Sequence, residues 1–166
     1  MEDSANRDAV LKLLRFASTH NSTDEQNVSL DDYVARMKEG QKKIYYLVAT
    51  SWQTASTSPY LEELKKKGVE VLLLWERIDE WLMGNLFEFE GKEFVSVTAS
   101  DLQLGDLADK EEEKKSQEVA EKSKPLVERF KKALGDKVTD VRTTTRLTDS
   151  PSCVVAEAGS FVSAQM

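Results

Sequence analysis

Two short and almost continuously apolar segments constrain the fold of this chain most. Residues 43–49 and 69–75 are rich in β-branched, aromatic and leucine side chains, which is typical of strands covered on both faces. Between them, Ser58 and Pro59 begin a helix that Gly68 ends. Strand, helix and strand in this order predict a βαβ unit with parallel strands and a right-handed crossover. The predicted fold class is therefore α/β.

Further elements are predicted on both sides of this unit. Apolar residues at helical spacing predict a helix over 6–18 that is buried on more than one side. A shorter capped helix is expected over 29–37, and a third helix over 77–86. Residues 87–97 should form a hairpin that turns at Glu90 and Gly91. Together these elements predict a small three-layer αβα subdomain whose βαβ unit is preceded by helices.

The composition changes after residue 108. Acidic residues and lysines are interspersed over 109–124 with almost no apolar side chain, which is typical of a solvated helix or linker. Beyond it we expect a helix that ends at Gly135 and strands over 138–147 and 153–156, which would make a partial α+β domain. The predicted organisation is a helical connector (1–40), a small α/β subdomain (41–108), a charged linker or helix (109–124) and the truncated start of a C-terminal domain (125–166).

The charge of the chain disfavours two classes of partner. Lysine and arginine number 23 against 30 aspartate and glutamate residues, which gives a net charge of −7. The resulting field repels phosphate backbones and anionic lipid, so we expect no nucleic-acid or membrane partner. The first residues lack the basic and apolar stretches of a signal peptide, and no apolar run reaches the length of a membrane span. We therefore expect a cytoplasmic location.

The residue inventory argues against a catalytic, metal or nucleotide site. The 7 glycines are too widely separated for a dinucleotide-binding loop or a P-loop. One cysteine and one histidine are too few for a conventional zinc site, and Cys153 and His20 lie on opposite sides of the predicted linker, which disfavours a nucleophilic pair. An enzyme built on the βαβ unit would need converging polar groups in a pocket, and the sequence indicates none.

Several strings of residues match the sequence pattern of one protein family. They follow one another in the same order as in that family and cover nearly the whole chain. They are LLRFAST (13–19), DYVARMKEGQKKIYY (32–46), KGVEVLLL (67–74), RIDEW (77–81), DVR (140–142) and RLTDSP (146–151). By these strings the chain resembles bacterial members of the ninety-kilodalton heat-shock chaperone family, the high-temperature protein G family. The string at 32–46 is specific enough to carry the resemblance by itself.

The resemblance implies a fragment of a longer chain. The matching part would be the C-terminal portion of the middle domain and the beginning of the C-terminal dimerisation domain. The family's ATP-binding N-terminal domain would be absent, and with it the sites for ATP and magnesium. The arginine of the larger middle subdomain that meets the γ-phosphate would be absent as well. The resemblance therefore implies no catalytic residue, no cofactor and no ATPase activity here. The parent would be a homodimer, and the fragment a monomer or a weak associate.

The resemblance also implies a chaperone role. In the family this region relays ATP-driven conformational change and offers surface to clients, which are unfolded or partly folded polypeptides, with co-chaperones as further partners. The family's client-contact patch includes a Glu-Trp pair after Ile-Asp, which corresponds here to Glu80 and Trp81. Family members commonly carry Asn three residues after that Trp, whereas here it follows one position later, at Asn85. Of the family's second client surface, on a C-terminal amphipathic helix, Phe161 and Met166 would remain.

Helical projection supports a modest version of this assignment. Ile78, Leu82 and Leu86 would share the inward stripe of the helix over 77–86, and Trp81 would lie at its flank, partly exposed. From the residues alone, Trp81 is better explained as a rim residue of the core, and only the resemblance favours the client surface. The alternative function is that of a purely structural connector between domains, with no client contact.

Overall fold

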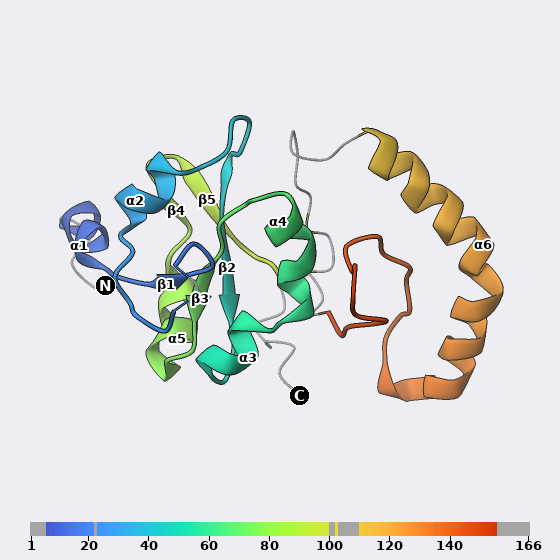
Figure 1. Cartoon of the computed structure of the whole chain (residues 1–166). Coiled ribbons are helices and arrows are strands. Elements are labelled where there is room, and N and C mark those ends of the chain that lie inside the picture. The colour runs from blue at the N-terminus through green and yellow to red at the C-terminus, as the bar shows by residue number, and fades with distance from the viewer. Residues whose placement is uncertain (1–5, 22, 100–101, 103–109, 156–166) are drawn as a thin grey trace.

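The two apolar segments form the central parallel strands of a mixed sheet. In the computed structural model, which describes residues 6–21, 23–99, 102 and 110–155, β2 (Lys43–Val48) lies parallel to β3 (Leu72–Leu74), as predicted. The crossover between them consists of α3 (Trp52–Ser56), η1 (Pro59–Leu61) and α4 (Glu62–Lys66) (Figure 1). Side-chain oxygens of Ser51 and Ser58 cap the first two of these elements, and Pro59 occupies the first position of η1. The helix α3 was not predicted.

Three more strands complete a five-stranded sheet in the order β1-β3-β2-β5-β4. β1 (Ala17–Ser18) is antiparallel to β3, and β5 (Lys92–Ser96) is parallel to β2. β4 (Glu88–Phe89) pairs antiparallel with β5, which confirms the predicted hairpin. Its turn has left-handed backbone at both Glu90 (φ 50°) and Gly91 (φ 72°).

Helices cover both faces of the sheet, so the predicted three-layer αβα arrangement is confirmed. α1 (Arg7–Leu13), α2 (Leu30–Ala35) and α5 (Arg77–Asn85) supply one core, and the crossover helices supply the other. β2 feeds both cores by alternation, because Ile44 faces the first while Tyr45 and Leu47 face the second. This explains why the strand reads as continuously apolar in the sequence.

The predicted N-terminal helix is wrong beyond residue 13. α1 ends at Leu13, and Phe16 pairs with Val28 just before β1. Val10 and Leu13 are exposed (44% and 74%), so this helix is not buried on more than one side. The apolar spacing fits a helix equally well, but pairing with the edge of β3 fixes residues 17 and 18 as a strand.

A buried tyrosine joins α2 to the sheet. The Tyr33 hydroxyl donates a hydrogen bond to the backbone oxygen of Glu70 (2.7 Å) and accepts one from the backbone nitrogen of Tyr45 (3.0 Å). It also accepts one from the side-chain amide of Gln41 (3.2 Å). The side chain is fully buried, and this burial raises the pKa of Tyr33. The hydroxyl is thus the common partner of three segments.

An ion pair reinforces the same junction. The Arg36 guanidinium forms two hydrogen bonds with the Glu70 carboxylate, both 2.9 Å long, and the Ser18 hydroxyl donates a third (2.6 Å). Tyr33, Gln41 and Arg36 all belong to the string at 32–46. The network therefore gives a structural reason for the residue types in that string.

Gly84 offers a test of the helix that carries Trp81. A Cβ at this helical position would meet nothing within 4 Å, so Gly84→Ala should stabilise the protein by about 0.5–1 kcal/mol by restricting the unfolded chain. The matched control is Gly68→Ala, where φ is +66° and the new Cβ would lie 3.2 Å from Lys38 Nζ. That variant should be less stable than the parent in urea unfolding. Equal effects of the two substitutions would contradict the helix geometry.

The C-terminal part differs most from expectation. α6 (Lys110–Leu134) is one continuous helix that passes through Pro125 and leads into η3 (Gly135–Lys137). The strands predicted over 138–147 and 153–155 are wrong, because none of the described residues after η3 is in a strand; residue 156 lies outside the described residues. α6 crosses the domain boundary predicted at residue 125, and the division into domains stays a prediction.

Two further features of the described residues bear on function. None of their helices is long and apolar enough to cross a membrane. Cys153 is half-buried in irregular chain rather than in the predicted strand, and burial raises the pKa of its thiol. A raised pKa keeps more of the thiol protonated and so lowers its reactivity at neutral pH.

Candidate functional site

The helix α5 is fixed at its start by a reciprocal cap. The Asp79 carboxylate accepts hydrogen bonds from the backbone nitrogens of Trp75 (3.1 Å) and Glu76 (2.9 Å). Burial raises the pKa of Asp79, and these two hydrogen bonds partly offset the rise. Because Asp79 must face the end of β3 to make both bonds, the cap determines the rotation of the helix about its axis.

The inward face of α5 is not the predicted one. Met83 and Leu86 are buried in the first core, and Leu82 packs against it. Together with Asp79 they form the spacing i, i+3, i+4, i+7 of one helix face. Ile78, which was predicted to point inward, is 59% exposed. The prediction was wrong because the partly buried cap, and not the first apolar residue, begins the inward stripe.

The outward face of α5 therefore presents two large apolar side chains. Trp81 is 54% exposed and lies three residues after Ile78, so the two are neighbours on the helix surface. Asn85 follows one turn later, and its side-chain amide donates a hydrogen bond to the backbone oxygen of Trp81 (2.8 Å). We call Ile78, Trp81 and Asn85 the exposed α5 face.

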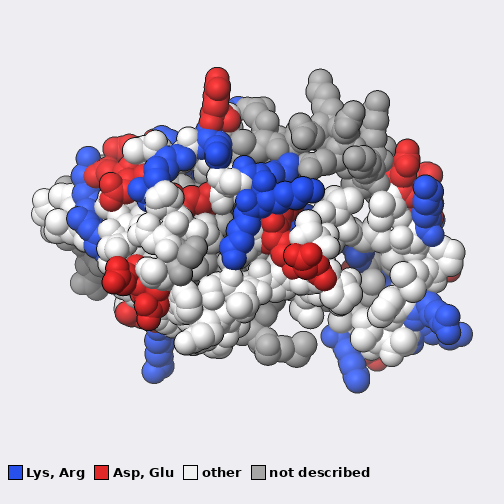
Figure 2. All heavy atoms as spheres, in the orientation of Figure 1, with Lys and Arg blue, Asp and Glu red and all other residues white. Residues whose placement is uncertain are grey.

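Glu80 lies beside this face rather than on it. It is exposed, but successive residues of an α-helix are rotated by about 100°, so its side chain leaves the helix to one side of Trp81. Figure 2 shows acidic side chains next to uncharged surface in the region where Figure 1 places α5. Of the predicted client residues, the structure thus brings Trp81 and Asn85 together, with Glu80 at their edge. Phe161 and Met166 lie outside the described residues.

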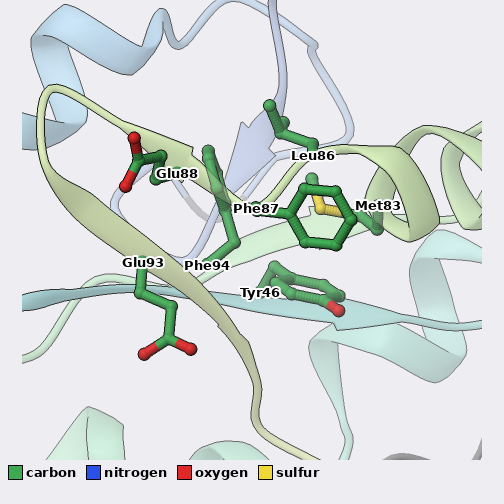
Figure 3. A pocket seen from close by; sticks show the side chains of 7 residues that line it. All are labelled: Tyr46, Met83, Leu86, Phe87, Glu88, Glu93 and Phe94. Carbon is green, nitrogen blue, oxygen red and sulfur yellow. The ribbon is translucent and has the colours of Figure 1, made fainter.

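An open hollow begins where α5 ends. It has a volume of about 460 Å³ and is lined by Tyr46, Met83, Leu86, Phe87, Glu88, Glu93 and Phe94. Figure 3 shows the ring of Phe87 in front of Met83 and above the ring of Tyr46. Phe87 is 67% exposed, and the lining combines aromatic and aliphatic residues with the carboxylates of Glu88 and Glu93, so the wall of the hollow is partly polar and partly apolar.

Sequence reasoning missed both Ile78 and this hollow. The hollow is assembled from β2, the end of α5 and the hairpin of β4 and β5, which no local pattern brings together. A signal for Phe87 was present, because this large apolar residue at the first position of the predicted hairpin has no assigned core face. Within the described part of the chain, no group of three or more His, Cys, Asp or Glu residues is placed to hold a metal ion.

Comparisons with known proteins give one family for the whole chain. The family model described as Hsp90 protein matches residues 1–166. A chaperone protein HtpG of Shewanella amazonensis is 59% identical over 162 residues, which cover 98% of this chain and 25% of the relative. For a chaperone protein HtpG of Burkholderia cenocepacia the identity is 62% over 157 residues, or 94% of this chain and 24% of the relative.

A third relative agrees. A chaperone protein HtpG of Bordetella avium is 58% identical over 154 residues, which cover 93% of this chain and 24% of the relative. The chain therefore spans about a quarter of the length of the curated relatives it matches.

Proposed function

Because this chain belongs to the Hsp90 protein family, we propose that it is a segment of a molecular chaperone that binds unfolded or partly folded polypeptide through the exposed α5 face. We propose further that it relays ATP-driven conformational change between the domains of the whole protein. The names of the relatives, chaperone protein HtpG, support the chaperone role. The client contact is proposed from the exposed α5 face of this chain, and the relay is proposed from its membership of the family.

The observation that carries the client proposal is the exposure of Trp81. A tryptophan that is half exposed beside an exposed isoleucine leaves apolar surface in water, although the same helix buries Met83 and Leu86 on its other side. Trp is the residue type most enriched where partners bind, because it buries a large area while few side-chain torsions are fixed.

The neighbours of Trp81 suit weak and reversible contact. The side-chain amide of Asn85 donates a hydrogen bond to the backbone oxygen of Trp81, and the charged side chain of Glu80 keeps the edge of the exposed α5 face hydrated. The hollow at Phe87 offers a second contact, with aromatic and aliphatic residues beside Glu88 and Glu93. Separate small contact sites favour chains whose side chains are spaced apart and accessible, which is the condition of an unfolded polypeptide.

Further proposals concern the whole protein. ATP and magnesium would bind the parent's N-terminal domain, so we propose no catalysis by this segment itself. The parent would be a cytoplasmic homodimer that also engages co-chaperones. These statements rest on family membership, and the chain covers about a quarter of each relative.

The alternative is a connector with no client contact. It is favoured by the two cores that make the α/β unit a rigid body, since a rigid body transmits motion between the parts attached to it. The two functions are compatible in principle, but they differ in what happens at α5. Only the chaperone surface requires contact with a client there.

The client proposal is tested by titrating this chain with a permanently unfolded protein while amide resonances are recorded. We expect shifts at residues 77–87 that grow with concentration, and constant resonances in α4. Reduced and carboxymethylated α-lactalbumin is a suitable client, with native α-lactalbumin as the matched control. Resonances of α5 that stay constant while other surfaces shift would contradict the assignment.

A further inference from the structure

The segment that follows α6 runs back to the α/β unit. Residues 138–155 contain no helix or strand, and Figure 1 shows them between α6 and the side of the unit formed by α4. A chain without regular structure keeps one path only if side-chain contacts offset the loss of conformational entropy. The contacts that the structure describes for this segment are concentrated at two places, one at the α/β unit and one at α6.

The first place is the carboxylate of Glu62 on α4. It accepts hydrogen bonds from the backbone nitrogens of Thr148 (2.5 Å), Asp149 (2.9 Å) and Ser150 (3.2 Å). The hydroxyls of Thr148 and Ser150 donate to it as well. Successive backbone amides around one anion form a nest, which is specific for a negative group. Led by the bond from Ser150, these contacts lower the pKa of Glu62 to about 2, so the carboxylate is ionised at neutral pH.

Arg146 adds a second set of contacts at the same end. Its guanidinium donates hydrogen bonds to the backbone oxygens of Val97 (2.7 Å) and Ala99 (3.1 Å), just beyond β5. Its Nε lies 3.6 Å from a carboxylate oxygen of Glu63, and both side chains are about four-fifths buried, with exposures of 20% and 18%. The segment is therefore attached to both α4 and the end of β5.

The second place is Asp140, at the α6 end of the segment. Its carboxylate forms an ion pair with Lys131 of α6 and accepts a hydrogen bond from Arg142 Nε (2.9 Å). Residues 138–150 are thus held at one end by α6 and at the other by the α/β unit. This is the arrangement of a brace between two bodies rather than of a free linker.

We propose that residues 138–150 act as a brace that fixes the orientation of α6 relative to the α/β unit, with Glu62 as the positioning residue of the joint. The inference rests on the proposed relay function and names the contact through which motion would pass. From Glu62 the path is short, because Leu61 and Leu64, on either side of it, are buried in the second core with Leu47 and Leu73 of the sheet. Motion of α6 would therefore reach the sheet that carries α5 on its other face.

The test uses the chain as described, with Glu62→Gln as the main variant. Gln has the shape of Glu but lacks the charge that the nest recognises, and amide hydrogen exchange at residues 148–150 should rise at least about five-fold. Ser150→Ala removes a partner from the opposite side and should act in the same direction. Glu128→Gln, on an exposed position of α6, is the matched control. Exchange in β2 and β3 should stay at its parental rate in all three variants.

The mechanical part is measured by the distance between spin labels. Labels at Gln53→Cys in α3 and Glu121→Cys in α6, in a Cys153→Ser background, should give one narrow distance distribution that broadens in Glu62→Gln. Faster exchange at 148–150 with an unchanged distribution would overturn the brace and leave only a local contact. Unchanged exchange would overturn it as well. Neither result bears on client binding at Trp81, which the amide titration tests separately.

Discussion

Replacing Trp81 by Ala is expected to weaken the binding of an unfolded polypeptide to this chain by about ten-fold or more, because a Trp that anchors a partner typically contributes about 2 kcal/mol or more. The substitution removes the largest apolar group of the exposed α5 face and leaves the inward residues Met83 and Leu86 in place. Binding would be measured by fluorescence anisotropy with labelled, carboxymethylated α-lactalbumin. Stability in urea should change little, since the side chain is 54% exposed.

The matched control is Phe130→Ala on α6. Phe130 is also an exposed aromatic residue (50%), so its removal deletes a similar amount of apolar surface at another place. We expect the affinity for the client to stay within about two-fold of the parent, as for residues outside the energetic centre of an interface. If both substitutions weaken binding equally, contact is non-specific and the assignment to α5 is wrong. In a full-length chain, Trp81→Ala with normal ATP turnover and reduced client affinity would separate a client surface from a connector.

The second large effect concerns stability. Tyr33→Phe is expected to lower the free energy of unfolding by about 3 kcal/mol, since it leaves buried polar groups without a partner. The backbone nitrogen of Tyr45 loses its acceptor and the backbone oxygen of Glu70 loses its donor, while Gln41 keeps its bond to the backbone oxygen of Lys43 (2.9 Å). Urea unfolding should show a lower midpoint and an unchanged slope.

Tyr46→Phe is the control for this prediction. Tyr46 lies on the same strand as Tyr45, but no described residue forms a hydrogen bond with its hydroxyl, so the loss should stay below about 0.5 kcal/mol, as for surface changes that break no buried contact. A Tyr33→Phe variant as stable as Tyr46→Phe would mean that the hydroxyl does not connect α2 to the sheet.

The parts of the fold that local chemistry determines were predictable. The continuous apolarity of 43–49 predicted a strand covered on both faces, and Ser29 predicted the start of α2, where the structure shows a reciprocal cap with Asp32. The hairpin followed from the turn residues Glu90 and Gly91. In each case the signal and the structure lie within the same few residues.

The errors arise where distant segments decide. Residues 138–147 are rich in the β-branched Val and Thr side chains that strands favour, yet none of the described residues pairs with them, and strand formation depends on a partner. Conversely, residues 17 and 18 lie in a segment with helical spacing, but β3 provides them with a strand to pair with. The local periodicity of a sequence does not show whether a partner strand is present.

The same distinction applies to the candidate site. The exposure of Trp81 followed from its position on the helix, whereas Ile78 was placed on the wrong face because the cap at Asp79 sets the rotation. The hollow at Phe87 joins three elements and was not predictable from any one of them. The contacts of Glu62 with residues 148–150 link positions far apart in the sequence, so no spacing rule could indicate them.

The central claim is that the exposed α5 face touches the client. The most direct measurement replaces Trp81 by the photoreactive residue p-benzoylphenylalanine and irradiates the chain with an unfolded polypeptide, with the same residue at Phe130 for comparison. We predict a covalent adduct from position 81 that excess unlabelled client abolishes, and little adduct from position 130. Absence of an adduct at position 81, or equal adducts from both positions, would contradict the claim.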